Sequence, residues 1–144
     1  MVGILIIAHG SMGETLIRCA THVIGSRPLR VQSLAVTGGA EPDALLDQAL
    51  GAIAQLDVGD GVLVLTDMLG GTPSNIAART LAHGKVQAVA GLNLPMLIRV
   101  LTYRGQSLES VKAKAVSGGR DGVSELSTEC PDNAPGEIFK RAAR

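Results

Sequence analysis

Short apolar runs alternate with longer amphipathic segments along most of this chain, and that alternation restricts it to an α/β fold. Four apolar runs have the length of buried strands, at about Val2 to Ala8, 31–36, 61–66 and 86–90. Segments with helical spacing follow them, and we expect helices to begin at Ser11, Pro42, Thr72 and Pro95, with one more over 107–119. The sequence therefore predicts a doubly wound sheet covered by helices. Its core must be aliphatic, because the chain has one Tyr, one Phe and no Trp.

Two of the helix starts carry capping signals. The stretch "SMGE" is typical of a capping box, with Ser11 as the N-cap and Glu14 at the third helical position. Thr72 is predicted to cap the helix that follows the third strand, with Pro73 as its first residue and Gly84 as its stop. These signals place hydroxyl groups at the beginnings of two helices.

The chain has the length of one domain, with 144 residues and no internal repeat. We predict a single domain over residues 1–128. Its last element would be a short strand, "GVSELS", at 122–127. Residues 129–144 mix Pro and charges with few apolar side chains, so we expect them to form a loosely held tail.

Charge and composition exclude several classes of function. Thirteen basic residues balance thirteen acidic ones, so no overall field draws the protein to nucleic acid or to a membrane surface. Two cysteines, Cys19 and Cys130, make neither a disulfide framework nor a metal cluster. The opening "VGILIIA" is too short to span a membrane and follows no basic leader. We therefore expect a cytoplasmic protein without nucleic-acid partners.

Two polar residues stand where strands end. His9 ends the first apolar run and Asp67 follows the third. If the strand order is 2-1-3-4, those strands are neighbours and the two side chains face each other in the crevice at the carboxyl edge, where α/β sheets bind ligands. A carboxylate that is bonded to one imidazole nitrogen fixes the tautomer and leaves the other nitrogen as a nucleophile or base.

The surroundings of this pair favour an anion. Hydroxyls at two helix starts and three flexible glycines lie next to it in the sequence, at Ser11, Thr72, Gly10, Gly70 and Gly71. Helix N-termini hold phosphate well, and glycine lets backbone N–H groups approach closely. The pattern therefore predicts phosphoryl transfer to and from His9, with no metal and no cofactor, because such transfer depends on positioning and electrostatics. His22 and His83 lack comparable neighbours.

Four stretches together carry a family resemblance: "IIAHGSMGETL", "VLTDMLGGTPSNIAA", "AGLNLPML" and "GGRDGV". Over residues 2 to 127 the chain resembles the mannose-type enzyme IIA domain of the bacterial phosphoenolpyruvate:sugar phosphotransferase system. The resemblance implies a phosphotransferase in which His9 takes phosphate from the phosphocarrier protein HPr and passes it to a IIB protein. It also implies that Asp67 holds the imidazole ring and that the Thr72 hydroxyl lies near the phosphoryl group.

The same resemblance carries expectations about architecture. It implies parallel strands in the order 2-1-3-4 and a C-terminal antiparallel strand, here 122–127, exchanged between the subunits of a homodimer. The protein would be peripheral to a membrane transporter if it is linked to transport. Whether it feeds a sugar transporter or a regulatory relay stays open at this point, as does the sugar.

Three other functions compete with this interpretation. A receiver-like signalling domain would use Asp67 as the phosphate acceptor, but it would need acidic residues after the first strand, where this chain has Ala8-His9-Gly10. A small metal chelatase shares "AHGS" after its first strand but needs further ligands in the same cleft. A ligand-binding module would use His9 for hydrogen bonding alone.

Overall fold

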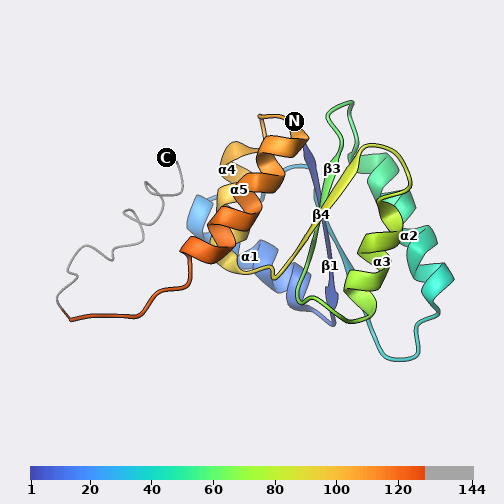
Figure 1. Ribbon diagram of the computed structural model, residues 1–144, viewed down its shortest axis with the longest axis horizontal. Helices are drawn as coiled ribbons and strands as arrows, with labels where there is room; N and C mark the ends of the chain where they lie inside the picture. Colours follow the sequence, from blue (N-terminus) through green and yellow to red (C-terminus); the bar gives the residue numbers. More distant parts are fainter. Residues whose placement is uncertain (129–144) are drawn as a thin grey trace.

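The computed structural model describes residues 1–128, which form one parallel sheet with helices on both faces (Figure 1). The strands are β1 (Gly3–His9), β2 (Val31–Val36), β3 (Val62–Thr66) and β4 (Val86–Ala90). The helices are α1 (Met12–Ile24), α2 (Pro42–Leu56), α3 (Thr72–Thr80), α4 (Leu94–Tyr103) and α5 (Leu108–Asp121). The sheet order is β2-β1-β3-β4 with every neighbouring pair parallel. The predicted fold class and strand order are confirmed.

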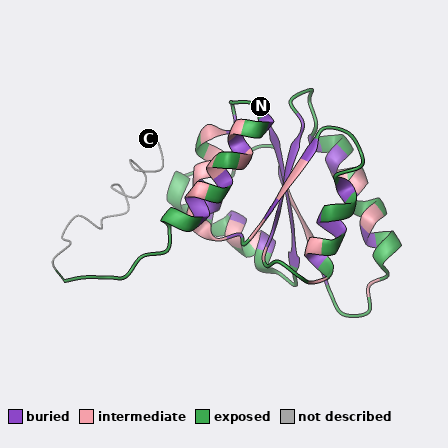
Figure 2. Ribbon diagram, in the orientation of Figure 1, coloured by how far each residue is buried: buried purple, intermediate pink, exposed green. Residues whose placement is uncertain are grey.

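Two aliphatic cores lie on opposite faces of the sheet. One packs side chains of β1 such as Ile4 and Ile6 against α1, α4 and α5. The other packs Leu5 and Ile7 of the same strand against α2 and α3. Figure 2 shows the central strands β1 and β3 buried almost throughout, the edge strands β2 and β4 only partly buried, and the outer faces of the helices exposed. This arrangement follows from the continuous apolar runs, because a strand that is covered on both faces needs no polar alternation.

The carboxyl ends of β1 and β3 meet at one edge of the sheet, at the lower end of Figure 1. In the register of these strands Ile7 lies opposite Thr66, so the residues just beyond both come to the same edge. The chain leaves β1 through Gly10, whose φ of +54° belongs to the left-handed region that favours glycine. That turn lets α1 begin three residues after the strand ends.

Arg104 closes the amino end of β1 and β2. Its side chain is 6% exposed, and all three of its nitrogens donate to backbone carbonyls. Nε and Nη2 donate to Val2 at 3.1 Å each, Nη2 also donates to Arg30 at 2.9 Å, and Nη1 donates to Leu29 at 2.5 Å. These carbonyls precede the two strands. Burial lowers the pKa of Arg104 to about 10, with a smaller contribution from the charge of Arg30, so the guanidinium is charged at neutral pH.

Both predicted cap arrangements were wrong in detail. Ser11 occupies the N-cap position of α1, but its side chain makes no cap hydrogen bond. Glu14 instead forms an ion pair with Arg27 at 2.8 Å, so the capping box does not form. The N-cap of α3 is Gly71, and Thr72 is the first helical residue. This helix ends at Thr80, before the predicted stop at Gly84.

The predicted C-terminal strand is absent from the part of the chain that the structure describes. Helix α5 ends at Asp121, and residues 123–127 are assigned to no strand. Val123 and Leu126 are exposed there by 78% and 88%. A strand needs a neighbour to pair with, and the sequence pattern alone could not supply one. The predicted tail, residues 129–144, lies outside the described residues.

Candidate functional site

His9 and Asp67 form the centre of the site. The ring Nδ1 of His9 lies 2.8 Å from Oδ2 of Asp67, and the backbone N–H of His9 donates to the same oxygen at 2.9 Å. The other carboxylate oxygen accepts the N–H of Met68 at 3.0 Å. The sequence-based expectation that the two side chains face each other is therefore met by the geometry.

Exposure differs sharply within the pair. The His9 side chain is 52% exposed, whereas that of Asp67 is 8% exposed. Burial is the largest single influence on Asp67 and opposes its ionisation, but hydrogen bonds from the His9 N–H, the His9 ring and the Met68 N–H outweigh it. The pKa of Asp67 therefore lies below its usual range. The carboxylate is buried and ionised, while the imidazole reaches solvent.

The hydrogen bond assigns the tautomer of the ring. An ionised carboxylate can only accept, so Nδ1 must carry a proton and the neutral ring leaves Nε2 unprotonated. Gly71 lies beside this edge of the ring, because a Cβ built on it would be 3.5 Å from Cε1 and 3.8 Å from Nε2 of His9. The atom that can act as a nucleophile thus lies next to the backbone at the start of α3.

Two helix N-termini point toward the same edge of the sheet. Helix α1 begins three residues after His9, and helix α3 begins five residues after Asp67. The first N–H groups of a helix have no partner within it, and the helix dipole makes this end partly positive. Both helices therefore favour negative charge at this edge of the sheet.

The backbone N–H groups of the glycines predicted to lie near the site are already hydrogen-bonded within the protein. The Gly10 N–H donates to the carbonyl of Val36 at 2.9 Å and so extends the ladder between β1 and β2. The N–H groups of Gly70 and Gly71 donate to the hydroxyl of Ser74 at 3.0 and 3.2 Å. The hydroxyls of Ser11 and Thr72 have no hydrogen-bond partner among the described residues.

Ser74 was missed by the sequence reasoning. It is the third residue of α3, and its hydroxyl reaches back to the N–H of the N-cap Gly71 and donates to the carbonyl of that residue at 3.2 Å. A polar side chain at the third helical position can bond the N-cap N–H, which is half of a capping box. That signal was present in "GGTPSN", but the preceding Thr72 was given the capping role instead.

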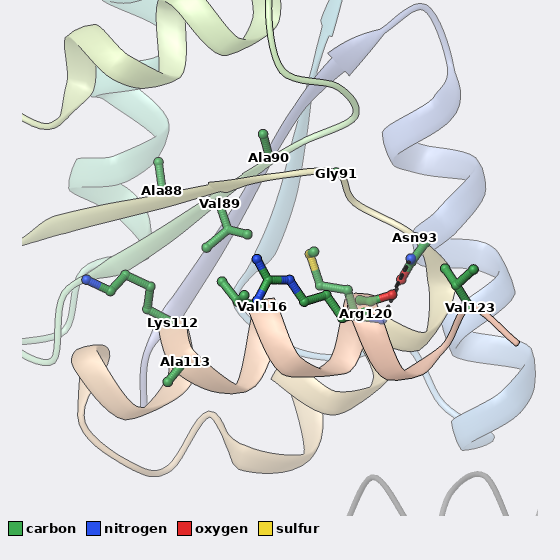
Figure 3. A pocket seen from close by; sticks show the side chains of 12 residues that line it. Ala88, Val89, Ala90, Gly91, Asn93, Lys112, Ala113, Val116, Arg120 and Val123 are labelled. Atoms are coloured by element: carbon green, nitrogen blue, oxygen red, sulfur yellow. Dashed lines mark hydrogen bonds between the residues drawn. The ribbon is translucent and has the colours of Figure 1, made fainter.

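A separate groove of about 600 Å³ lies away from His9, between the free edge of β4 and helix α5 (Figure 3). Its lining is apolar on the strand side, with Val89, and carries Lys112 and Arg120 on the helix side. Neither His22 nor His83 lies in it, and both are exposed. Among residues 1–128 no three His, Cys, Asp or Glu side chains are grouped so as to hold a metal ion. Within the same residues no helix is long and apolar enough to cross a membrane.

A family model and a curated relative both identify the chain as similar to components of the phosphotransferase system. The EIIA-man family model, described as "PTS system fructose IIA component", matches residues 3–116. The chain is 32% identical over 136 residues to the "PTS system mannose-specific EIIAB component" of Escherichia coli K12. The match covers 92% of this chain but 42% of that protein. The chain thus spans less than half the length of this relative.

Two further similarities concern regulation and fold. The "Transcriptional regulatory protein LevR" of Bacillus subtilis is 35% identical over 68 residues, which is 46% of this chain and 7% of that protein. A crystal structure of "phosphotransferase system component EIIA" from Streptococcus agalactiae superposes with a TM-score of 0.79 at 24% identity. The superposition covers 89% of this chain and 99% of that one. At that identity the superposition shows a shared fold.

Proposed function

The chain belongs to the EIIA-man family of phosphotransferase-system components, and we propose that Nε2 of His9 carries its phosphoryl group. Proteins of this class are phosphoryl carriers, so the chain is a phosphotransferase. The single observation that carries the residue assignment is the 2.8 Å contact between Nδ1 of His9 and Asp67, which in the neutral ring makes Nε2 the unprotonated nitrogen of a half-exposed side chain.

The reaction needs one bond to form and one to break. The lone pair of Nε2 attacks the phosphorus of the phosphorylated donor while the bond between phosphorus and the donor atom breaks, and that electron pair returns to the donor. The ring becomes cationic, and the buried carboxylate of Asp67 stabilises it through the Nδ1–H. The loose transition state asks for positioning and for donors around the phosphoryl oxygens. We expect the Thr72 and Ser11 hydroxyls and the N–H groups at the starts of α1 and α3 to serve as such donors.

Phospho-HPr is the proposed donor and a IIB protein the proposed acceptor, in a cytoplasmic setting. Both must bring their reacting atom to Nε2, so they must contact the surface around His9. Exposed apolar side chains follow both members of the pair in the sequence: Met12 lies three residues after His9, and Met68 and Leu69 directly follow Asp67, with Leu69 82% exposed. Exposed apolar groups beside a reactive residue are typical of a protein–protein contact surface. If the acceptor belongs to a transporter, the protein is peripheral to the membrane.

A regulatory relay is the second candidate, and one observation favours it. The chain is similar to part of LevR, whose name describes a transcriptional regulator. The carrier chemistry is the same in both cases, so the two candidates differ in the acceptor. Incubating the phosphorylated protein with a IIB protein, and separately with a regulator of the LevR type, distinguishes them by which one receives the phosphate.

We also retain the homodimer as a proposal. The free edge of β4 borders the groove in Figure 3, and the segment that follows α5 carries the exposed Val123 and Leu126 with Glu125 between them. Residues 122–127 of a second copy could pair with β4 while Glu125 meets Lys112 and Arg120. Light scattering should give a dimer for residues 1–128 and monomers or aggregates for residues 1–121. A full-strength dimer from the shorter chain refutes pairing through this segment.

The assignment of His9 is tested directly by incubation with phosphoenolpyruvate, enzyme I and HPr, followed by mass mapping of the phosphate. We expect a single phosphohistidine at His9. Phosphate on Asp67 would favour the receiver-like alternative, and no phosphate at all would favour the ligand-binding alternative.

A further inference from the structure

Two backbone N–H groups in the loop that precedes α3 converge on one oxygen. The N–H groups of Gly70 and Gly71 lie 3.0 and 3.2 Å from the same acceptor, the hydroxyl oxygen of Ser74. Gly70 has a φ of +80°, a left-handed conformation that glycine adopts without strain. Adjacent N–H groups that converge in this way form a nest that suits an anionic oxygen.

This nest lies where a phosphoryl group would need donors. A Cβ built on Gly71 would lie 3.5 Å from Cε1 and 3.8 Å from Nε2 of His9, so this residue lies close to the exposed edge of the ring. A phosphoryl group on Nε2 brings three acceptor oxygens and a charge near −2 to that edge. Nearby donors include the same two N–H groups, and in the unphosphorylated protein the Ser74 hydroxyl already occupies them.

We propose that Ser74 is a positioning residue that competes with the phosphoryl group for the Gly70 and Gly71 N–H groups and so limits how tightly phosphorylated His9 is held. This inference rests on the proposed function of His9. Hydrogen bonds to a charged acceptor are about twice as strong as those to a neutral one, so the phosphoryl oxygens win the exchange. The free energy gained from these new hydrogen bonds is reduced, because the bonds from Gly70 and Gly71 to the Ser74 hydroxyl are lost. A carrier benefits, because phosphate that is held too strongly is not passed on.

Substitutions at Ser74 test this competition in a graded way. Ser74→Ala removes the competing acceptor, Ser74→Cys weakens it because sulfur is a poor acceptor, and Ser74→Thr keeps the hydroxyl. The matched control is Ser110→Ala, because Ser110 is also the third residue of its helix, α5, and its hydroxyl bonds Gln106 outside the site. Each variant is equilibrated with a fixed ratio of phospho-HPr to HPr, and the phosphorylated fraction is read by intact mass.

We expect the equilibrium constant for phosphorylation to rise about tenfold in Ser74→Ala, with Ser74→Cys between it and wild type. Ser74→Thr and Ser110→Ala should match wild type. The Gly70 and Gly71 amide resonances should shift on phosphorylation in wild type, and in unphosphorylated Ser74→Ala their hydrogen exchange should be faster. If Ser74→Ala fails to fold, the Cys and Thr variants carry the comparison.

Two outcomes overturn the inference and are distinguishable from each other. Faster exchange at Gly70 and Gly71 in Ser74→Ala without a higher phosphorylated fraction means that Ser74 only holds the turn, and the role of His9 is unaffected. An unphosphorylated wild-type protein removes the proposed function of His9 and this inference with it.

Discussion

The two ends of the sheet hold ionisable side chains in complementary ways. At the amino end, Arg104 is buried and donates from every nitrogen to the carbonyls that precede β1 and β2. At the carboxyl end, Asp67 is buried and accepts from the N–H groups of His9 and Met68. The difference is that the second network includes an exposed imidazole whose Nε2 has no partner among the described residues. At the amino end every nitrogen of the buried side chain is hydrogen-bonded, whereas at the carboxyl end Nε2 of His9 stays open, and this is the atom that we propose to react.

The largest effect is expected at the open atom. His9→Ala should abolish phosphorylation by phospho-HPr, because within residues 1–128 neither of the other two histidines is hydrogen-bonded to a carboxylate. The free energy of unfolding should change little, since the ring is half exposed. Intact mass and denaturant titration measure the two quantities.

The matched controls are the other two histidines. His22→Ala and His83→Ala should accept phosphate as wild type does, because both residues are exposed and neither is hydrogen-bonded to Asp67. Phosphorylation that persists in His9→Ala, or is lost in either control, would contradict the assignment of His9 as the phosphorylated residue.

Removing the Arg104 hydrogen bonds at the amino end should lower stability and leave phosphorylation of His9 unchanged. Arg104→Met keeps much of the side-chain volume but leaves the carbonyls of Val2, Leu29 and Arg30 without this donor. We expect the free energy of unfolding to fall by about 3 kcal/mol, because unsatisfied buried polar groups are costly. Well below the melting temperature, phosphorylation of His9 should match wild type.

Its control is Arg79→Met, which breaks the exposed ion pair with Asp43. Such surface pairs contribute at most about 1 kcal/mol. A loss in Arg104→Met no larger than that in Arg79→Met would contradict the role assigned to the amino end.

Asp67→Asn should weaken the hydrogen bonding around His9 while the fold is kept. The amide can present its NH₂ to the ring and favour the wrong tautomer, so the rate of phosphoryl transfer should fall about tenfold or more. Stopped-flow transfer from phospho-HPr measures it, and an unchanged rate would make Asp67 a turn residue only.

The pH dependence of stability gives an independent check on Asp67. Its pKa is lowered in the folded protein, so its ionised form contributes stability above the unfolded pKa, and this is lost as the pH falls through the folded pKa. Asp67→Asn should lack this part of the acid destabilisation. Urea titrations at neutral and acidic pH should therefore give a difference between the two proteins that shrinks as the pH falls.

The smallest effect is expected at the turn that carries the chain out of β1. Gly10→Ala places a Cβ on a residue with φ of +54°, which should cost about 1 kcal/mol of folding free energy. The control Gly51→Ala lies on the exposed face of α2 and should stabilise by a similar amount, because alanine is the better helix former. Equal effects of the same sign would mean that the turn tolerates a side chain.

Patterns of neighbouring residues in the sequence predicted the features that depend on neighbouring residues, namely the strands and one helix start. The apolar runs gave all four strands within one residue, and Pro42 marked the start of α2 correctly. The pairing of His9 with Asp67 followed from the rule that parallel strands gather their carboxyl ends at one edge, once the strand order was assumed.

Contacts between distant residues decided the rest. The capping box failed because Arg27, thirteen residues away, forms an ion pair with Glu14. Arg104 reached the carbonyls of residues more than seventy positions earlier, and no local signal indicates that. The strand predicted at 122–127 has a suitable pattern, but a strand is defined by its neighbour in a sheet, and the pattern of one chain does not provide it.

One oxygen of Asp67 accepts from both the ring and the main chain of His9. These two hydrogen bonds leave the imidazole little rotational freedom, so we expect Nε2 to face one direction throughout the proposed reaction. In the proposed carrier reaction, donor and acceptor must then approach along the same path, so that they exclude each other. We therefore expect ping-pong steady-state kinetics, with inhibition by excess unphosphorylated donor because it occupies the path that the acceptor needs.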